Sequence, residues 1–230
     1  QWHAGSNLYP NASCAWVLTD TATPEAPALS GGVLTLSTSD LSEFMYYEQT
    51  GSSLSIPATL TISARLRVVA ESHLADPRRG VAIAFAVAPD QMNVLWIGQD
   101  EVFLWSAFGV QGPTAAVDTD NAFHTYDITV VGQSAITVSQ DGAQILSGSI
   151  HGTGGAVTQA RLWWGDGTSS ASATSEWMFF RHNANATACG TPSLSINDVT
   201  VTEGNSGTTS FSFAVTLSAL WSLGAGAIPM

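Results

Sequence analysis

The chain has 230 residues, of which 45% are hydrophobic and 10% charged, enough for one sizeable domain that buries a core without help from metals. Eighteen Asp and Glu oppose six Arg and no Lys, for a formal net charge of −12. These numbers argue against nucleic acid and anionic membrane surfaces as partners, since both need clustered Lys or Arg, and no apolar run reaches the ~18 residues that membrane insertion requires.

Short alternating strands follow one another along the chain. Alternation marks residues 33–37, 60–69 and 81–88, and in the last of these large residues alternate with alanine, as in a strand pressed closely on both sides. Residues 94–106 predict a hairpin that turns around Gly98 and Asp100, and 161–165 and 176–182 predict two later strands. No stretch has a helical period. We therefore expect an all-β, antiparallel jelly-roll β-sandwich.

The segment 123–148 (FHTYDITVVGQSAITVSQDGAQILSG) predicts alternating strands joined by a Gly-Gln-Ser turn and an Asp141-Gly142 hairpin. His124 shares the face of Tyr126, Ile128 and Val130, which their side chains make the core side. We therefore interpret His124 as a packing residue with one hydrogen bond rather than as a catalytic group or a ligand.

The two cysteines, Cys14 and Cys189, lie in polar, loop-like contexts at opposite ends of the same apparent domain. Two free cysteines in the core are one interpretation. The other, which we favour, is a disulfide that joins the ends of the domain and implies an oxidising compartment. With the acidic, Lys-free composition, common in secreted bacterial proteins, it predicts a secreted or cell-surface protein of bacterial origin.

A resemblance rests on the order Asp118, Phe123, His124, Tyr126, then the Asp141-Gly142 turn, followed later by Trp164-Gly165-Asp166. This order is similar to the laminin-G and concanavalin-A-like jelly-roll superfamily over about residues 8–182, and places a sandwich domain at 1–190. The superfamily includes sugar-binding lectins, adhesion modules and glycoside hydrolases, so the resemblance implies a fold more sharply than a function.

A second resemblance covers residues 193–218, which look like the first two strands of a Calx-β module. In that family the Glu that matches Glu203 can help to bind calcium, but the acidic cluster at the far end of the module has no counterpart here. We expect a partial Calx-β-like segment at 191–218 and a tail at 219–230 that fits neither family. Because two strands are marginal alone, they are expected to dock, to stay disordered or to pair with another chain.

Aromatic side chains on the predicted strands suit a carbohydrate or cell-surface polymer, because flat rings stack on the apolar faces of sugars. The candidate ligand-binding residues are Tyr46, Tyr47, Trp96, Trp105 and Trp164. Since side chains alternate along a strand, the consecutive Trp163-Trp164 forces one of the two rings out of the core.

No cofactor is required by this sequence, and the spacing of its histidines does not suit zinc. Calcium is the candidate metal. Loop carboxylates at Asp118, Asp120 and Asp166 offer hard oxygen ligands, and the jelly rolls of the superfamily often hold Ca²⁺ in loops. The alternative is that these acids are solvated turn residues.

A hydrolase, most naturally a glycoside hydrolase, is the alternative function. Its chemistry needs two carboxylates roughly 5–10 Å apart. Glu48, which shares its strand face with Tyr46, is the best single candidate, with Asp100, Glu101 or Asp166 as its partner. The Glu-x-Asp-x-Glu strand of many catalytic members of the superfamily is absent, and so is a Gly-x-Ser-x-Gly elbow. Binding module and enzyme both stay open at this point.

Overall fold

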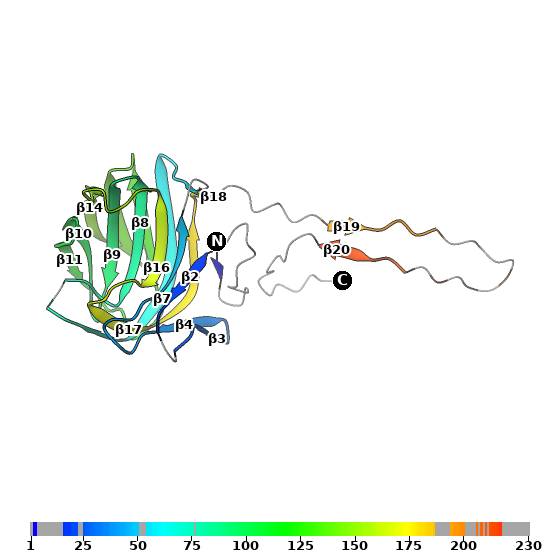
Figure 1. Cartoon of the computed structure of the whole chain (residues 1–230), viewed down its shortest axis with the longest axis horizontal. Coiled ribbons are helices and arrows are strands. Elements are labelled where there is room, and N and C mark those ends of the chain that lie inside the picture. The colour runs from blue at the N-terminus through cyan, green and yellow to red at the C-terminus, as the bar shows by residue number, and fades with distance from the viewer. Residues whose placement is uncertain are drawn as a thin grey trace.

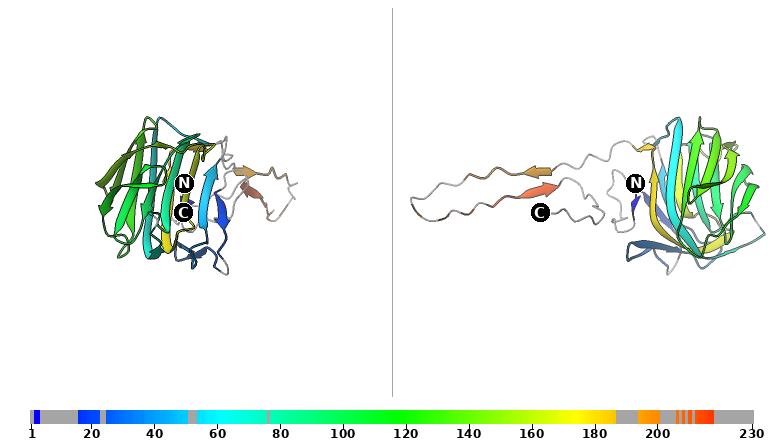
Figure 2. Two further views of the ribbon diagram at one scale, coloured as in Figure 1. Left: turned by 60° about the vertical axis from the view of Figure 1, so that its left-hand side comes forward. Right: turned by 180° about the vertical axis from the view of Figure 1, so that it is seen from behind.

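The computed structural model describes residues 2–3, 16–22, 25–50, 54–75, 77–186, 194–200, 206, 208, 210 and 212–217. Within these residues all regular structure is β, in two large antiparallel sheets packed face to face, seen from three sides in Figures 1 and 2. No helix long and apolar enough to cross a membrane occurs among them. The predicted all-β sandwich is confirmed.

The first sheet has the strand order β14-β13-β12-β7-β17-β4-β3, and β1 also pairs with β17. Its strands are β1 (Trp2–His3), β3 (Ala28–Ser30), β4 (Val33–Ser37), β7 (Thr59–His73), β12 (His124–Val131), β13 (Ala135–Gln140), β14 (Ala143–Ser149) and β17 (Ala171–His182).

The second sheet has the order β11-β10-β9-β8-β16-β5-β2, and β15 also pairs with β9. Its strands are β2 (Val17–Asp20), β5 (Met45–Thr50), β8 (Val81–Ala88), β9 (Gln91–Ile97), β10 (Glu101–Ala107), β11 (Val110–Ala116), β15 (His151–Gly152) and β16 (Arg161–Asp166). Two short pairs complete the set: β6 (Leu54–Ser55) with β18 (Asn185–Ala186), and β19 (Leu194–Ile196) with β20 (Val215–Leu217).

Strand alternation builds the main core between the sheets. Tyr126, Ile128 and Val130 of β12 are all fully buried there, as their shared face predicts. The Asp141-Gly142 turn joins β13 to β14, and both residues have positive φ, 50° and 85°, which is the conformation that a tight hairpin turn requires.

β8 is buried on both faces. Val81, Ile83 and Phe85 belong to the core between the sheets, and the alternate alanines belong to a second apolar cluster on the outer face of the second sheet. The members of this second cluster are Ala82, Ala84, Ala86, Met92, Val94, Trp96, Phe103, Trp105 and Trp163. A large apolar layer outside a two-sheet core is the feature that positions the candidate site.

The C-terminal strands β19 and β20 pair with each other through Ile196 and Val215, and both side chains are exposed. The Calx-β-like segment and the domain boundaries at 190 and 218 stay predictions. Cys14, Cys189, Glu203 and the tail at 219–230 lie outside the described residues, so the predicted disulfide stays a prediction as well.

Candidate functional site

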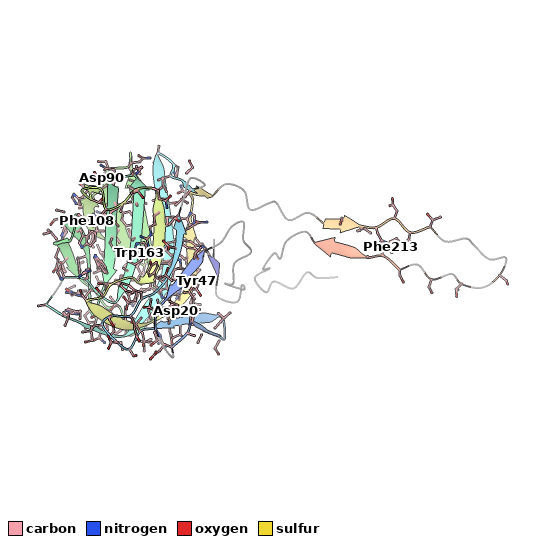
Figure 3. All side chains as sticks on the ribbon, viewed as in Figure 1. Asp20, Tyr47, Asp90, Phe108, Trp163 and Phe213 are labelled. Carbon is pink, nitrogen blue, oxygen red and sulfur yellow. The ribbon has the colours of Figure 1, made fainter. Side chains whose placement is uncertain are left out.

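Five aromatic rings run across the outer face of the second sheet. In order they are Tyr46, Trp163, Trp96, Trp105 and Phe108, with successive ring centroids 5.5, 6.3, 5.7 and 5.2 Å apart. We call this set the aromatic row; Trp163 and Phe108 are labelled in Figure 3. The strand register places small residues of β8 between the larger ones: Ala84 lies beside Trp163 and Ala82 beside Trp96. The alanines therefore leave room for the indoles to lie over the sheet.

The aromatic row is covered in its middle and open at one end. Trp105 is 7% exposed, whereas its neighbour Phe108 is 43% exposed. The indole N–H groups of Trp96 and Trp105 are buried and have no hydrogen-bond partner among the described residues. Buried N–H groups without a partner are uncommon in proteins, and these two lie in the covered part of the row.

Two adjoining cavities open along the row and share Ala156, Val157 and Arg161. Together we call them the β16 cleft. Its apolar end has a volume of about 210 Å³ and its polar end about 300 Å³. The apolar end is also lined by Ala86, Met92, Trp105, Phe108 and Trp163, and the polar end by Glu48, Thr50, Thr158 and Gln159. Rings at one end and hydrogen-bonding groups at the other give the cleft an amphipathic lining.

Arg161 stands between the two ends. Its Nε lies 2.7 Å from Oε2 of Glu48, an ion pair of close approach. Its Nη2 donates a hydrogen bond of 3.2 Å to the hydroxyl of Tyr46, and the guanidinium carbon is 5.7 Å from the centroid of that ring. The positive charge of Arg161 is thus matched by one carboxylate within the same cleft.

Asp90 holds the segment that forms the far wall of the cleft. Its Oδ1 accepts hydrogen bonds from the backbone N–H and hydroxyl of Thr153, at 2.8 and 2.7 Å, and from the N–H of Gly155 at 2.8 Å. Its own N–H donates to the carbonyl of Val157 at 2.7 Å. The backbone hydrogen bond from Gly155, followed by those from Thr153, lowers the pKa of Asp90. The sequence alone does not single out Asp90, because an acid that follows a strand is typical of any turn.

Three of the predicted ligand-binding residues, Tyr46, Trp96 and Trp105, belong to the aromatic row, but Trp105 alone of the three lines the β16 cleft, and Trp96 is buried at 2% exposure. The prediction is wrong for Tyr47 and Trp164, which are 4% and 0% exposed and stack on each other in the core with centroids 5.1 Å apart. Since β5 and β16 are adjacent, Tyr47 and Trp164 are register partners and point inward together. The ring that alternation forces outward is Trp163.

The carboxylates predicted for a hydrolase do not converge on Glu48. Asp100 and Glu101 lie at the start of β10, four strands from β5 in the sheet order, which at ~4.8 Å per strand separates them by about 19 Å across the sheet. Glu101 instead accepts a hydrogen bond of 2.7 Å from Nε of Arg79. The predicted catalytic pair is therefore wrong, because these strands are not neighbours.

Asp166 is also in a different place from the one predicted. It ends β16 as a buried residue, and its Oδ2 accepts a hydrogen bond of 2.5 Å from the hydroxyl of Thr38. Burial raises its pKa to about 7. Asp166 thus fixes one end of the sandwich and joins neither Glu48 nor the loop carboxylates.

The loop acids Asp118 and Asp120 do lie together, and Asp100 joins them in place of Asp166. One carboxylate oxygen from each of the three lies within 4.8 Å of the others. Asp118 folds its own loop by accepting hydrogen bonds from the N–H groups of Asp120, at 3.2 Å, and of Asn121. Three negatively charged oxygen donors are the ligand type that Ca²⁺ prefers.

His124 lies next to this loop as the first residue of β12. Its Nδ1 is 2.6 Å from Oδ2 of Asp141, and its Nε2 is 3.3 Å from Oδ1 of Asn121. It lines neither end of the β16 cleft. His124 is thus hydrogen-bonded as expected, but by two partners rather than one, and its Nε2 also lies 3.7 Å from Oδ1 of Asp118; that it has no catalytic or ligand-binding role stays a prediction.

No family model and no curated protein matches the chain. Solved structures do. A sialidase matches with a TM-score of 0.50 and 11% identity over 72% of this chain, which spans 17% of that protein. A carbohydrate esterase from Shiga toxin-encoding bacteriophage phi24B matches with a TM-score of 0.50 and 15% identity, over 74% of this chain and 88% of that one.

The carbohydrate recognition domain of Emp47p is similar at 12% identity over 80% of this chain and 92% of that one, with a TM-score of 0.45. At such identities a likeness is one of fold. The stacked antiparallel sheets and the two neighbours with a TM-score of 0.50 together show that the chain is an all-β jelly-roll sandwich.

Proposed function

We propose that this protein is a carbohydrate-binding module whose ligand site is the β16 cleft. The observation that carries the proposal is the juxtaposition of an open aromatic edge with a hydrogen-bonding pair. Phe108 offers an exposed ring face, and Glu48 and Arg161 offer acceptors and donors in the adjoining cavity. Sugars need this combination, because their rings have apolar faces and a polar rim of hydroxyls.

The size of the cleft supports a ligand of one or two sugar rings. Its polar end, about 300 Å³, is at the lower limit of typical small-molecule sites, roughly 300–1,000 Å³. Such a site suits the end of a glycan or a short stretch of a cell-surface polymer. The sialidase and the carbohydrate esterase that share the fold are both named for carbohydrates, which agrees with this ligand class.

A calcium ion is part of the proposal as an optional structural element. The carboxylates of Asp100, Asp118 and Asp120 would hold it, and its charge would offset their mutual repulsion and stiffen the loops that they join.

We also propose a secreted or cell-surface location for the module. The acidic composition and the two cysteines support it.

Chain-to-chain pairing through β19 and β20 is a further proposal, supported by the exposed side chains of Ile196 and Val215.

The hydrolase alternative is less well supported. Of the acids in the described residues that line the β16 cleft, Glu48 stands by itself, and Arg161 neutralises it. Glycoside hydrolysis needs a second carboxylate across the bond.

Titration calorimetry against a panel of soluble oligosaccharides tests the binding function. Phe108→Ala is expected to weaken binding of any responding sugar by about two- to tenfold, on the scale of about 0.5–1.5 kcal/mol for one aromatic contact. Phe213→Ala is the matched control, because Phe213 is 60% exposed but belongs to the C-terminal segment (Figure 3). Absence of binding to every sugar at millimolar concentration, or equal losses in the two variants, would refute the proposal.

A further inference from the structure

We propose that the β16 cleft selects neutral saccharides over uronic acids, and that Glu48 is the residue that sets this preference. The inference rests on the proposed carbohydrate-binding function and specifies its ligand class. It follows from the charges in and around the cleft rather than from its shape.

Arg161 is the one cation that lines either end of the cleft among the described residues. A carboxylate on a sugar would need this guanidinium as its partner, because paired Arg–carboxylate contacts are how proteins usually recognise such groups. The charge of this guanidinium is already balanced, since Oε2 of Glu48 lies 2.7 Å from Nε of Arg161, although the contact does not have hydrogen-bond geometry. A uronic acid would have to displace Glu48 or lie beside it.

Either outcome is unfavourable. Displacing Glu48 leaves a partly buried carboxylate without its cation, since the side chain of Glu48 is only 21% exposed. Binding beside Glu48 brings two like charges close together in a chain whose net charge is already −12. The hydroxyls of a neutral sugar meet neither penalty.

The rest of the polar end is suited to hydroxyl groups. Thr50, Thr158 and Gln159 add neutral donors and acceptors to the lining. The intact Glu48–Arg161 pair adds charged hydrogen-bond partners, which are stronger than neutral ones. The lining as a whole therefore combines strong hydrogen bonding with zero net charge.

The test compares matched neutral and uronic sugars, such as glucose with glucuronate and galactose with galacturonate oligosaccharides, by calorimetry at low salt. The wild-type protein is expected to bind the neutral member at least about tenfold more tightly. Glu48→Gln keeps the size and an acceptor oxygen but leaves Arg161 unpaired. Affinity for the uronic member should then rise about tenfold, and the gain should disappear near 0.5 M salt.

The chain offers a closely matched control. Glu176 pairs with Arg67 in the first sheet at the same Nε–Oε2 distance, 2.7 Å, and its exposure of 22% is close to that of Glu48, although the Arg67 contact is a hydrogen bond and the Arg161 contact is an ion pair without hydrogen-bond geometry. Glu176→Gln removes an equivalent charge away from the cleft and should leave the ratio of affinities unchanged. In the double variant Glu48→Gln, Arg161→Gln the cleft is neutral again, so the gain for uronic sugars should be lost.

Three outcomes would overturn the inference. One is wild-type protein that binds uronic sugars as tightly as neutral ones, which would leave the carbohydrate-binding function standing. Another is a ratio of neutral to uronic affinity that Glu48→Gln does not change, or that Glu176→Gln changes by the same factor. The last is no binding of either sugar class by any variant, which would refute the proposed function itself. If Glu48→Gln does not fold, Arg161→Gln replaces it and should widen the discrimination against uronic sugars.

Discussion

Replacing Asp166 by Asn should make the protein more stable at neutral and alkaline pH and leave its stability nearly unchanged in acid. Asp166 is 3% exposed at the end of β16, and burial raises its pKa from 3.8 to about 7. The carboxylates of Glu71 and Glu43 add to this effect by charge repulsion. The folded protein therefore prefers the protonated acid, and Asn resembles that form in shape and charge.

The magnitude follows from the linkage between pKa and stability. A pKa that rises from 3.8 to about 7 corresponds to at most about 4 kcal/mol of unfolding free energy, at roughly 1.4 kcal/mol for each tenfold change in the protonation equilibrium. Because the pKa is higher in the folded state, the contribution of the protonated acid is fully present below pH 3.8 and is lost as the pH rises through about 7. The advantage of Asn over Asp should therefore grow from near zero at pH 4 to a few kcal/mol at pH 8.

His182 contributes an opposite trend in the same pH range. Burial lowers the pKa of His182 to about 4. The neutral imidazole therefore contributes to the stability of the folded protein above pH 6.5, and this contribution is lost as the pH falls through about 4. The stability of the wild-type protein alone thus mixes two effects. The difference between variant and wild type at each pH isolates Asp166, because His182 is common to both.

Urea unfolding at constant ionic strength from pH 4 to pH 8 measures this difference. Asp127→Asn, a change of the same chemistry at an exposed position of β12, controls for the loss of one negative charge. A stability difference for Asp166→Asn that is constant with pH, that grows toward acid, or that Asp127→Asn reproduces would contradict the expectation.

Three further outcomes are expected. Asp90→Ala removes the hydrogen bonds that hold the segment around Gly155 in place, in a protein that should stay folded. Amide hydrogen exchange at Gly155 should become faster and sugar binding several-fold weaker, and an unchanged exchange rate would contradict this. Asn93→Ala should cost about 3 kcal/mol in urea unfolding, since the Asn93 side chain hydrogen-bonds both the N–H and the carbonyl of Trp105; a loss below 1 kcal/mol would contradict it. Calcium at 100 times its Kd should add about 2.7 kcal/mol of stability, measured as a rise in Tm that Asp118→Asn abolishes; an equal rise in that variant would place the ion elsewhere.

Local patterns in the sequence were enough to locate most of the strands. The alternation at 81–88 matches β8 to the residue, and the Asp141-Gly142 turn joins the predicted strands. Both signals are local: a period of two requires an extended chain with two faces, and residues that tolerate positive φ mark a tight turn. They identify strands without specifying their neighbours.

The pairing of strands into sheets determined which side chains from different strands lie together. Alternation required one of Trp163 and Trp164 to face outward, but the choice was made by the register with β5, which turns Tyr47 and Trp164 into the core together. The same holds for the acids. Asp100 meets the loop after β11 because antiparallel pairing sets Glu101 opposite Ala116, and Glu48 meets Arg161 because β5 and β16 are adjacent. Contacts between residues far apart in sequence exist once the sheet has formed, so no single strand contains the information that specifies them.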